Sequence, residues 1–188
     1  MTSKTNKLLD VSCNVLKQDL LTGHKKWTIA RVAKDAKVSR AWIYKYLGAK
    51  REEILLSSLQ TVMDDFLFMS PEAQRFLQKH GSLGAFKKTR DLVAKYPEVI
   101  IFVLKHAQSK DAIGQVIRDR EKIYTSKFLS TRYGLKNEFQ IAFLRSIVNG
   151  MALSFFYPVP KVNRLAEVVL SDRFLVWLRD QGDFLAEI

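Results

Sequence analysis

Apolar residues recur along almost the whole chain three and four positions apart, which is the spacing of one helix face. No segment alternates apolar and polar residues as a half-buried strand does. We therefore predict an all-α fold. The predicted helices run from Ser3 to about Leu21, over 28–36 and 39–47, from near Lys50 through Phe66, from near Gly84 to Tyr96, from Pro97 through Leu104, from Ala112 to about Leu129, from Asn137 to Phe156, and from Leu165 to about Leu178.

The apolar spacing between Thr28 and Ile54 predicts two short helices that meet across a tight turn. Thr28 and Ser39 precede them and are suitable N-caps, because a hydroxyl can accept a hydrogen bond from an unpaired backbone N–H of the first turn. We expect Val38 to be buried between the helices. The second helix is expected to show solvent a set of polar, aromatic and small residues, namely Arg40, Ala41, Trp42, Tyr44 and Lys45.

This stretch resembles the DNA-binding domain of the tetracycline-repressor (TetR) family. The resemblance covers about 27 contiguous residues and rests on the order of Thr28, Val32-Ala33, Ala36, Val38-Ser39, Ile43-Tyr44, Tyr46-Leu47, Lys50 and Ile54. Three positions depart from the family pattern. Lys37 stands where the turn usually has glycine, Trp42 where a small residue is usual, and Leu47 where phenylalanine is common. The Lys37 position implies a left-handed backbone.

The resemblance implies an N-terminal three-helix helix-turn-helix domain, residues 1–49, and a C-terminal helical ligand-binding and dimerisation domain, residues 50–188. It also implies which side chains meet DNA. Base edges would be near Ser39, Arg40, Ala41 and Trp42, and phosphates near Thr28, Tyr44, Tyr46 and Lys50, with Lys25, Lys26 and Lys45 adding nonspecific charge. Arg40 is the best candidate for reading guanine, because its guanidinium fork matches O6 and N7.

Two residues beside these helices, Trp27 and Lys50, can each be interpreted in two ways. Trp27 precedes the capping Thr28, and we interpret it as a packing residue in a hydrophobic staple rather than as a DNA-stacking group. Lys50 starts the predicted helix that connects the two domains. The N–H groups of that first turn suit a phosphate, but Glu52 and Glu53 also complement the same helix end.

The charge of the chain is concentrated near its start. Residues 1–51 hold 12 Lys and Arg against 3 Asp and Glu, a net charge of +9, out of +12 for all 188 residues. A cluster this local is typical of a nucleic-acid footprint, with solubility as the alternative explanation. The apolar fraction of 47% allows a substantial core.

The last two predicted helices carry apolar residues over more than one face, so each needs more than one packing partner. In the family that the chain resembles, such helices pair between subunits. We predict a homodimer, with a thick monomer core as the alternative. The candidate interface residues are Ile147, Met151, Ala152, Phe155, Val169 and Phe174.

The resemblance further implies a small apolar or aromatic effector inside the C-terminal domain. Aromatic residues at helical spacing can equally form an ordinary core. The candidate pocket residues are Phe66, Phe102, His106, Tyr124, Phe128 and Phe143.

Other classes of protein receive little support. Three dispersed histidines and the single Cys13 form no catalytic set and no metal-ligand spacing, so no enzyme activity, cofactor or metal is predicted. No apolar run is long enough to span a membrane.

We expect a bacterial cytoplasmic regulator, nucleoid-associated when bound. As a homodimer it would repress transcription at a palindromic operator in double-stranded DNA. The alternative is a ligand-independent or nonspecific DNA-binding helical protein.

Overall fold

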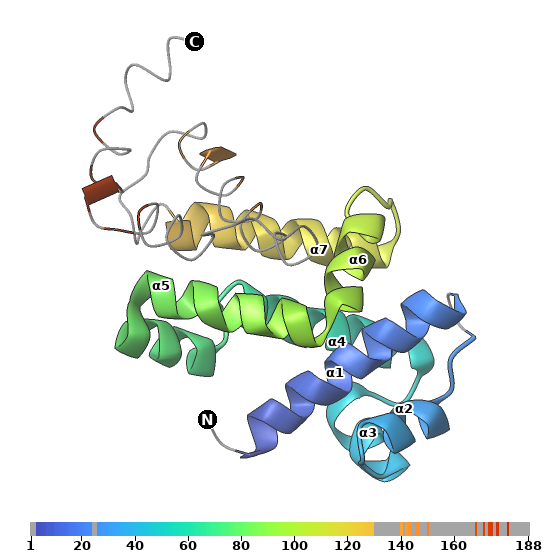
Figure 1. The fold of residues 1–188 in the computed structure, drawn as a ribbon. Coiled ribbons are helices and arrows are strands. Elements are labelled where there is room, and N and C mark those ends of the chain that lie inside the picture. The colour runs from blue at the N-terminus through green and yellow to red at the C-terminus, as the bar shows by residue number, and fades with distance from the viewer. Residues whose placement is uncertain are drawn as a thin grey trace. The chain divides into compact units, whose positions relative to one another are not determined.

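The computed structural model describes residues 3–23 and 26–129, together with single positions at 140, 142, 143, 146, 150, 168, 171, 173, 174, 176 and 180 (Figure 1). Within these residues the chain is all-helical, as predicted, and none of their helices has the length and apolar character that crossing a membrane requires. The elements are α1 (Ser3–Thr22), α2 (Ile29–Asp35), α3 (Arg40–Leu47), α4 (Arg51–Phe66), α5 (Pro71–Lys95), α6 (Pro97–His106), α7 (Ala112–Ile123) and the π-helical segment η1 (Tyr124–Leu129).

The chain divides into two compact units. The first contains Met1–Ala73 and Tyr96–Arg120, and the second contains Gln74–Lys95 and Glu121–Ile188. Helices α1 to α4 and α6 therefore belong to the first unit. The predicted domain boundary between residues 49 and 50 lies within the first unit, and the division into a DNA-binding and a regulatory domain stays a prediction.

Helix α1 is the centre of the first unit. It packs most extensively against α4, and also against α6 and α2. Its buried residues follow one another closely because it has neighbours on several sides; they are Leu9, Val11, Ser12, Cys13, Val15, Leu16, Gln18 and Asp19. The single cysteine, Cys13, is fully buried and therefore serves as a packing residue of α1.

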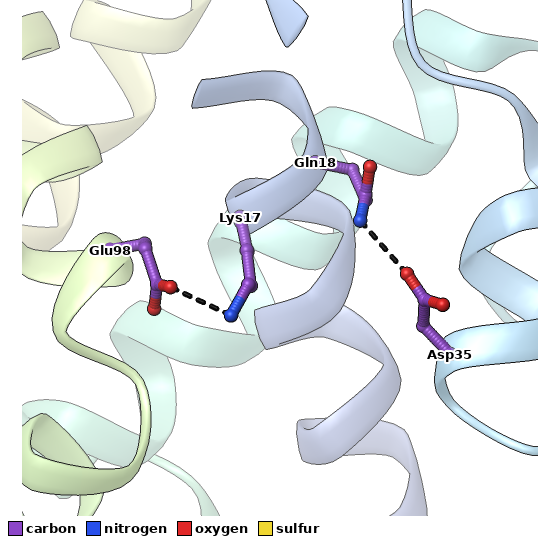
Figure 2. Close-up of polar contacts among 4 residues, drawn as sticks. All are labelled: Lys17, Gln18, Asp35 and Glu98. Atoms are coloured by element: carbon purple, nitrogen blue, oxygen red, sulfur yellow. Dashed lines mark hydrogen bonds and ion pairs between the residues drawn. The ribbon is translucent and has the colours of Figure 1, made fainter. Parts of the chain in front are cut away.

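Polar side chains on α1 reach elements that are distant in sequence. Lys17 Nζ lies 2.7 Å from Glu98 Oε1 on α6, and Gln18 Nε2 donates to Asp35 Oδ2 at the end of α2 over 2.9 Å. Figure 2 shows that these neighbouring residues point to different sides of α1. In addition, the Tyr96 hydroxyl lies 2.7 Å from Asp10 Oδ1. These contacts fix α1 to both α2 and α6.

Several predicted helix ends are confirmed. Pro97 occupies the first turn of α6, where its missing N–H costs nothing. Asp111 Oδ1 accepts a 3.0 Å hydrogen bond from Gly114 N and so caps α7. Gly23, which follows α1 close to its predicted end at Leu21, has a positive φ of 80°, as glycines after a helix often do.

The helix starting near Gly84 was predicted wrongly at its beginning. Residues 71–80 are already helical, and α5 continues to Lys95 across a kink at Gly81, where φ is 68°. Only glycine adopts that conformation readily, so the chain bends at Gly81. Helical residues lie on both sides of the bend, where the sequence predicts a helix on the C-terminal side alone. The Lys88 ammonium lies 5.5 Å from the ring centroid of Phe76, which places side chains from the two arms of α5 beside one another.

The helix predicted from Ala112 to Leu129 is correct in extent but changes character. Its last six residues form η1, with the wider π-helical hydrogen-bond pattern. The two final predicted helices, 137–156 and 165–178, lie for the most part outside the described residues.

The Lys17–Glu98 pair has a predictable effect on stability. Lys17→Met leaves Glu98, whose side chain is 20% exposed, without its cation. The Lys17 side chain is 36% exposed, so the pair is neither fully exposed nor fully buried. We therefore expect the free energy of unfolding to fall by roughly 1–2 kcal/mol, a value between those typical of surface and of buried ion pairs. Urea unfolding at neutral pH measures it, with Lys105→Met on the exposed side of α6 as the control.

The same pair should be sensitive to acid. Burial alone would raise the pKa of Glu98, but the hydrogen bond and charge of Lys17, together with a hydrogen bond from the backbone N–H of Glu98, outweigh burial and hold the pKa below its ordinary value. The stabilisation is therefore present above the unfolded pKa of about 4.3 and is lost as the pH falls through the lower folded pKa. A difference between wild type and Lys17→Met that persists unchanged into strong acid would contradict this assignment.

Candidate nucleic-acid interface

Helices α2 and α3 begin at the hydroxyl caps that the sequence predicts. Thr28 Oγ1 accepts a hydrogen bond from Arg31 N over 3.2 Å, and Ser39 Oγ accepts one from Trp42 N over 3.1 Å. Both capping residues have extended backbones, as N-caps do. The starts of both helices are therefore fixed by residues of the stretch itself.

The turn between α2 and α3 is left-handed at Lys37, whose φ is 52°. This confirms the conformation inferred from the position where glycine is expected. Val38 N donates to Ala33 O over 2.9 Å and closes the turn. Val38 was expected to be buried, but it is only half-buried, because the interior at this point is filled by Val32 and Ala33 of α2 and by Ile43 and Leu47 of α3.

Trp27 is a packing residue, as predicted, with only 1% of its surface exposed. Its indole Nε1 donates to Asp19 Oδ1 of α1 over 2.8 Å, so the buried N–H is satisfied. The Arg51 guanidinium lies 5.5 Å from the Trp27 ring centroid. Trp27 therefore fastens the start of α2 to α1.

The eight residues of α3 form four rows, each of two residues spaced four apart. The Ile43/Leu47 row is buried. The Ala41/Lys45 row is two positions away, about 200° around the helix, and is exposed. The Arg40/Tyr44 row, also exposed, forms one edge of the outer face, and the Trp42/Tyr46 row forms the other.

Trp42 was expected in solvent and is instead half-buried, as is Tyr46. Their ring centroids are 4.7 Å apart with an interplanar angle of 49°. The Lys45 ammonium lies 5.5 Å from the Tyr46 ring. Packing between these rings, one helical turn apart, withdraws part of Trp42 from solvent.

The junction between α3 and α4 is closed by Glu53. Its Oε2 accepts hydrogen bonds from Ala49 N at 3.0 Å and Lys50 N at 3.1 Å, and these N–H groups of Lys50 and Ala49 lower its pKa. Gly48 has a φ of 124°, and a Cβ there would lie 2.8 Å from Glu53 Cβ. The Glu53 carboxylate therefore already accepts from two backbone N–H groups that could otherwise have bound a phosphate. The Lys50 side chain remains exposed.

Cations are abundant on the surface around this helix pair. The exposed residues with positive side chains include Lys7, Lys26, Arg31, Lys34, Lys37, Arg40, Lys45, Lys50 and Arg51. Of the residues predicted to contact DNA, Lys26, Thr28, Ser39, Arg40, Ala41, Tyr44, Lys45 and Lys50 are all exposed. The structure therefore leaves most of the predicted set available to a ligand.

The predicted effector pocket stays a prediction. In the first unit Phe102 is buried, with its ring centroid 4.6 Å from that of His106, while His106 and Phe66 are half-buried. In the second unit Tyr124 is half-buried and Phe143 is 39% exposed. The side chain of Phe128 lies outside the described part.

The predicted dimer interface likewise stays a prediction. Phe174 is half-buried, and its backbone N–H donates to Ser171 Oγ over 3.3 Å. The remaining members of the predicted set lie outside the described residues; they are Ile147, Met151, Ala152, Phe155 and Val169.

Three residues that contribute to this region were not predicted from the sequence. Asp19 accepts from Trp27, Arg51 lies over the Trp27 ring, and the Lys7 ammonium lies 5.9 Å from the ring centroid of Trp42. The positive charge of Lys7 and Arg51 was counted in the N-terminal cluster, but no local pattern shows which rings they meet.

Comparison with known proteins gives no relative: no family model, no curated protein and no solved structure matches the chain. The TetR resemblance therefore remains an interpretation of residues 28–54.

Replacing Lys37 with glycine tests the energetics of the turn. A non-glycine residue at positive φ costs on the order of 1 kcal/mol, and glycine loses more backbone entropy on folding. We therefore expect Lys37→Gly to leave the free energy of unfolding unchanged or to raise it by up to about 1 kcal/mol. Denaturant unfolding measures the effect.

Lys34→Gly is the matched control, because it removes the same charge from a helical position in α2. It should destabilise the protein by about 1 kcal/mol. If both variants are destabilised alike, positive φ at Lys37 is not the source of strain.

Proposed function

We propose that the chain is a sequence-specific DNA-binding regulator of transcription, which as a homodimer inserts α3 of each subunit into the major groove of a palindromic operator. Its proposed action is repression, released by a small apolar or aromatic effector. The proposed location is the bacterial cytoplasm.

The outer face of α3 is the observation that carries this proposal. Its exposed side chains include two cations, Arg40 and Lys45, a phenol, Tyr44, and the small Ala41, while Ile43 and Leu47 hold the opposite face in the core. A surface of this kind offers hydrogen-bond donors for base edges and a methyl group for thymine.

The dimensions of α3 support the proposal. An α-helix such as α3 has a diameter of about 10–12 Å with its side chains, which matches the width of the major groove of about 12 Å. Both the Ser39 cap and the buried row fix the helix without using the outer face. Side chains on that face therefore remain available to bind DNA.

Electrostatics supports binding to phosphates around the groove. The +9 charge of residues 1–51 would release counterions from DNA and give strongly salt-dependent affinity. This contribution alone carries no sequence information, so it would be shared by a nonspecific DNA-binding protein. Sequence preference depends on the α3 face.

The dimer and the effector are proposed on separate grounds. Dimerisation rests on the apolar pattern of the last two predicted helices, and the effector rests on the family resemblance. A two-fold dimer would place two α3 helices on half-sites about one helical turn of DNA apart. Palindromy of the bound site is therefore a testable consequence of the proposal.

Selection from random DNA tests the proposed function. The purified full chain is incubated with duplexes of random sequence, and the retained fraction is amplified and sequenced over several rounds. Enrichment of one palindromic sequence is expected. Retention without any enriched sequence would favour the nonspecific alternative, and a lack of salt-dependent retention would refute DNA binding.

Base reading and phosphate contact should separate in two variants. Arg40→Ala is expected to cost roughly 1–3 kcal/mol on the selected site and to relax preference at one base pair per half-site, with little effect on scrambled DNA. Lys50→Ala should weaken both duplexes similarly and reduce the salt slope by about one per subunit.

Salt titrations on selected and scrambled duplexes measure this separation, with Lys105→Ala as a charge-loss control on α6. Equal weakening of both duplexes by Arg40→Ala would make Arg40 a phosphate contact and move base reading to other residues of the α3 face.

The assembly is tested by placing a charge in the predicted interface. Ala152→Asp and Val169→Asp should shift sedimentation toward the monomer and weaken binding to the selected site together, because an unpaired charge in an apolar contact is costly. A wild-type chain that sediments as a monomer at micromolar concentration would refute the dimer.

A further inference from the structure

We infer that Lys7, in the first turns of α1, is a phosphate contact held in place by Trp42, so that α1 forms one flank of the DNA interface. The inference rests on the proposed function. It adds a residue outside the recognition stretch 28–54 and gives a role to Trp42.

The position of Lys7 is defined by an aromatic ring that is itself fixed. The Lys7 ammonium lies 5.9 Å from the Trp42 ring centroid, within the distance at which a cation is attracted to an indole face. The Trp42 backbone is held by the Ser39 cap at 3.1 Å. Its ring packs on Tyr46 with centroids 4.7 Å apart.

The location of this cluster on α3 indicates what Lys7 would meet. A helix in the major groove has a sugar-phosphate wall along each side. On α3, the Arg40/Tyr44 edge contains a cation, whereas the Trp42/Tyr46 edge consists of two neutral aromatic residues. Lys7 brings a positive charge to this second edge, where the Lys45 ammonium also lies 5.5 Å from Tyr46.

Lys7 remains able to bind an anion while it contacts the ring. Its side chain is exposed, and an ammonium group has three N–H donors, none of which is used up by attraction to a ring face. Contact with Trp42 also restricts a long, flexible side chain before DNA arrives, which lowers the entropy lost on binding.

The bulk of Trp42 is needed for this arrangement. The resemblance places a small residue at this position, and a small side chain would leave Lys7 without a ring to contact. The half-buried indole instead bridges α3 and α1. Trp42 is therefore assigned as a positioning residue rather than as a reader of bases.

The salt dependence of DNA binding tests the role of Lys7. Binding of the full chain to a fluorescent duplex pool of random sequence is measured by anisotropy over a range of salt concentrations. Lys7→Gln should lower the slope of log K against log salt by about 0.9 per subunit, because one phosphate contact is lost. Lys7→Arg should keep the wild-type slope, and Lys105→Gln, the control, should also keep it.

The role of Trp42 is tested in the same assay. Trp42→Leu should lower affinity several-fold at low salt while leaving the slope unchanged, because the charge remains. In the Lys7→Gln background, the same substitution should have a clearly smaller effect, since the residue it positions is absent. Full additivity of the two substitutions would overturn the positioning role.

The outcomes separate this inference from the proposed function. An unchanged slope in Lys7→Gln, with a reduced slope in Lys50→Ala, would overturn the inference and leave DNA binding intact. A wild-type chain without salt-dependent binding to any duplex would refute both. Because Lys7 is exposed, thermal unfolding of Lys7→Gln should match wild type and exclude misfolding as the cause of a lost contact.

Discussion

The buried hydrogen bond between Trp27 and Asp19 is the constraint on which the arrangement of the first unit depends. An indole N–H and a carboxylate that are both almost inaccessible to water cannot rely on solvent for hydrogen bonding, and leaving the indole N–H unpaired would be costly. Their pairing fixes the segment before α2 against α1. Gln18, the next residue along α1 from Lys17, adds a bond to the end of α2, so both ends of that short helix are tied to α1.

Helix α1 is also tied to α6, through the ion pair between Lys17 and Glu98. A helix of seven residues such as α2 has little stability of its own, and its position must come from tertiary contacts. Helix α1 supplies these contacts while its apolar side chains pack against α4. Helix α3 packs in turn against α4 and α2, so the proposed reading helix is held mostly by residues outside its exposed face.

Local chemistry explains what could be predicted from sequence. The caps at Thr28 and Ser39, the proline at the start of α6 and the positive φ at Lys37 each depend on a few neighbouring residues, and all are confirmed. Contacts between distant positions were not accessible in this way. Apolar spacing indicates that α1 is a helix that packs in the core, but it cannot show that Asp19 meets Trp27 or that Lys7 meets Trp42. Helix 71–80 was missed because Ser70-Pro71 and Gly81 bracket it with residues typical of loops.

For the candidate site, the sequence identified the helix pair and most of the exposed residues. The partial burial of Trp42 could not be predicted, because it depends on packing against the Tyr46 ring.

The four rows of α3 have a consequence for how such a protein can diverge. Only Ile43 and Leu47 of its eight residues are buried, and its start is secured by Ser39 outside the helix. Positions 40, 41, 44 and 45 therefore contribute little to the free energy of folding. Substitutions there can accumulate without unfolding the chain, so the chemical identity of this outer surface can be rewritten while the supporting frame is inherited unchanged.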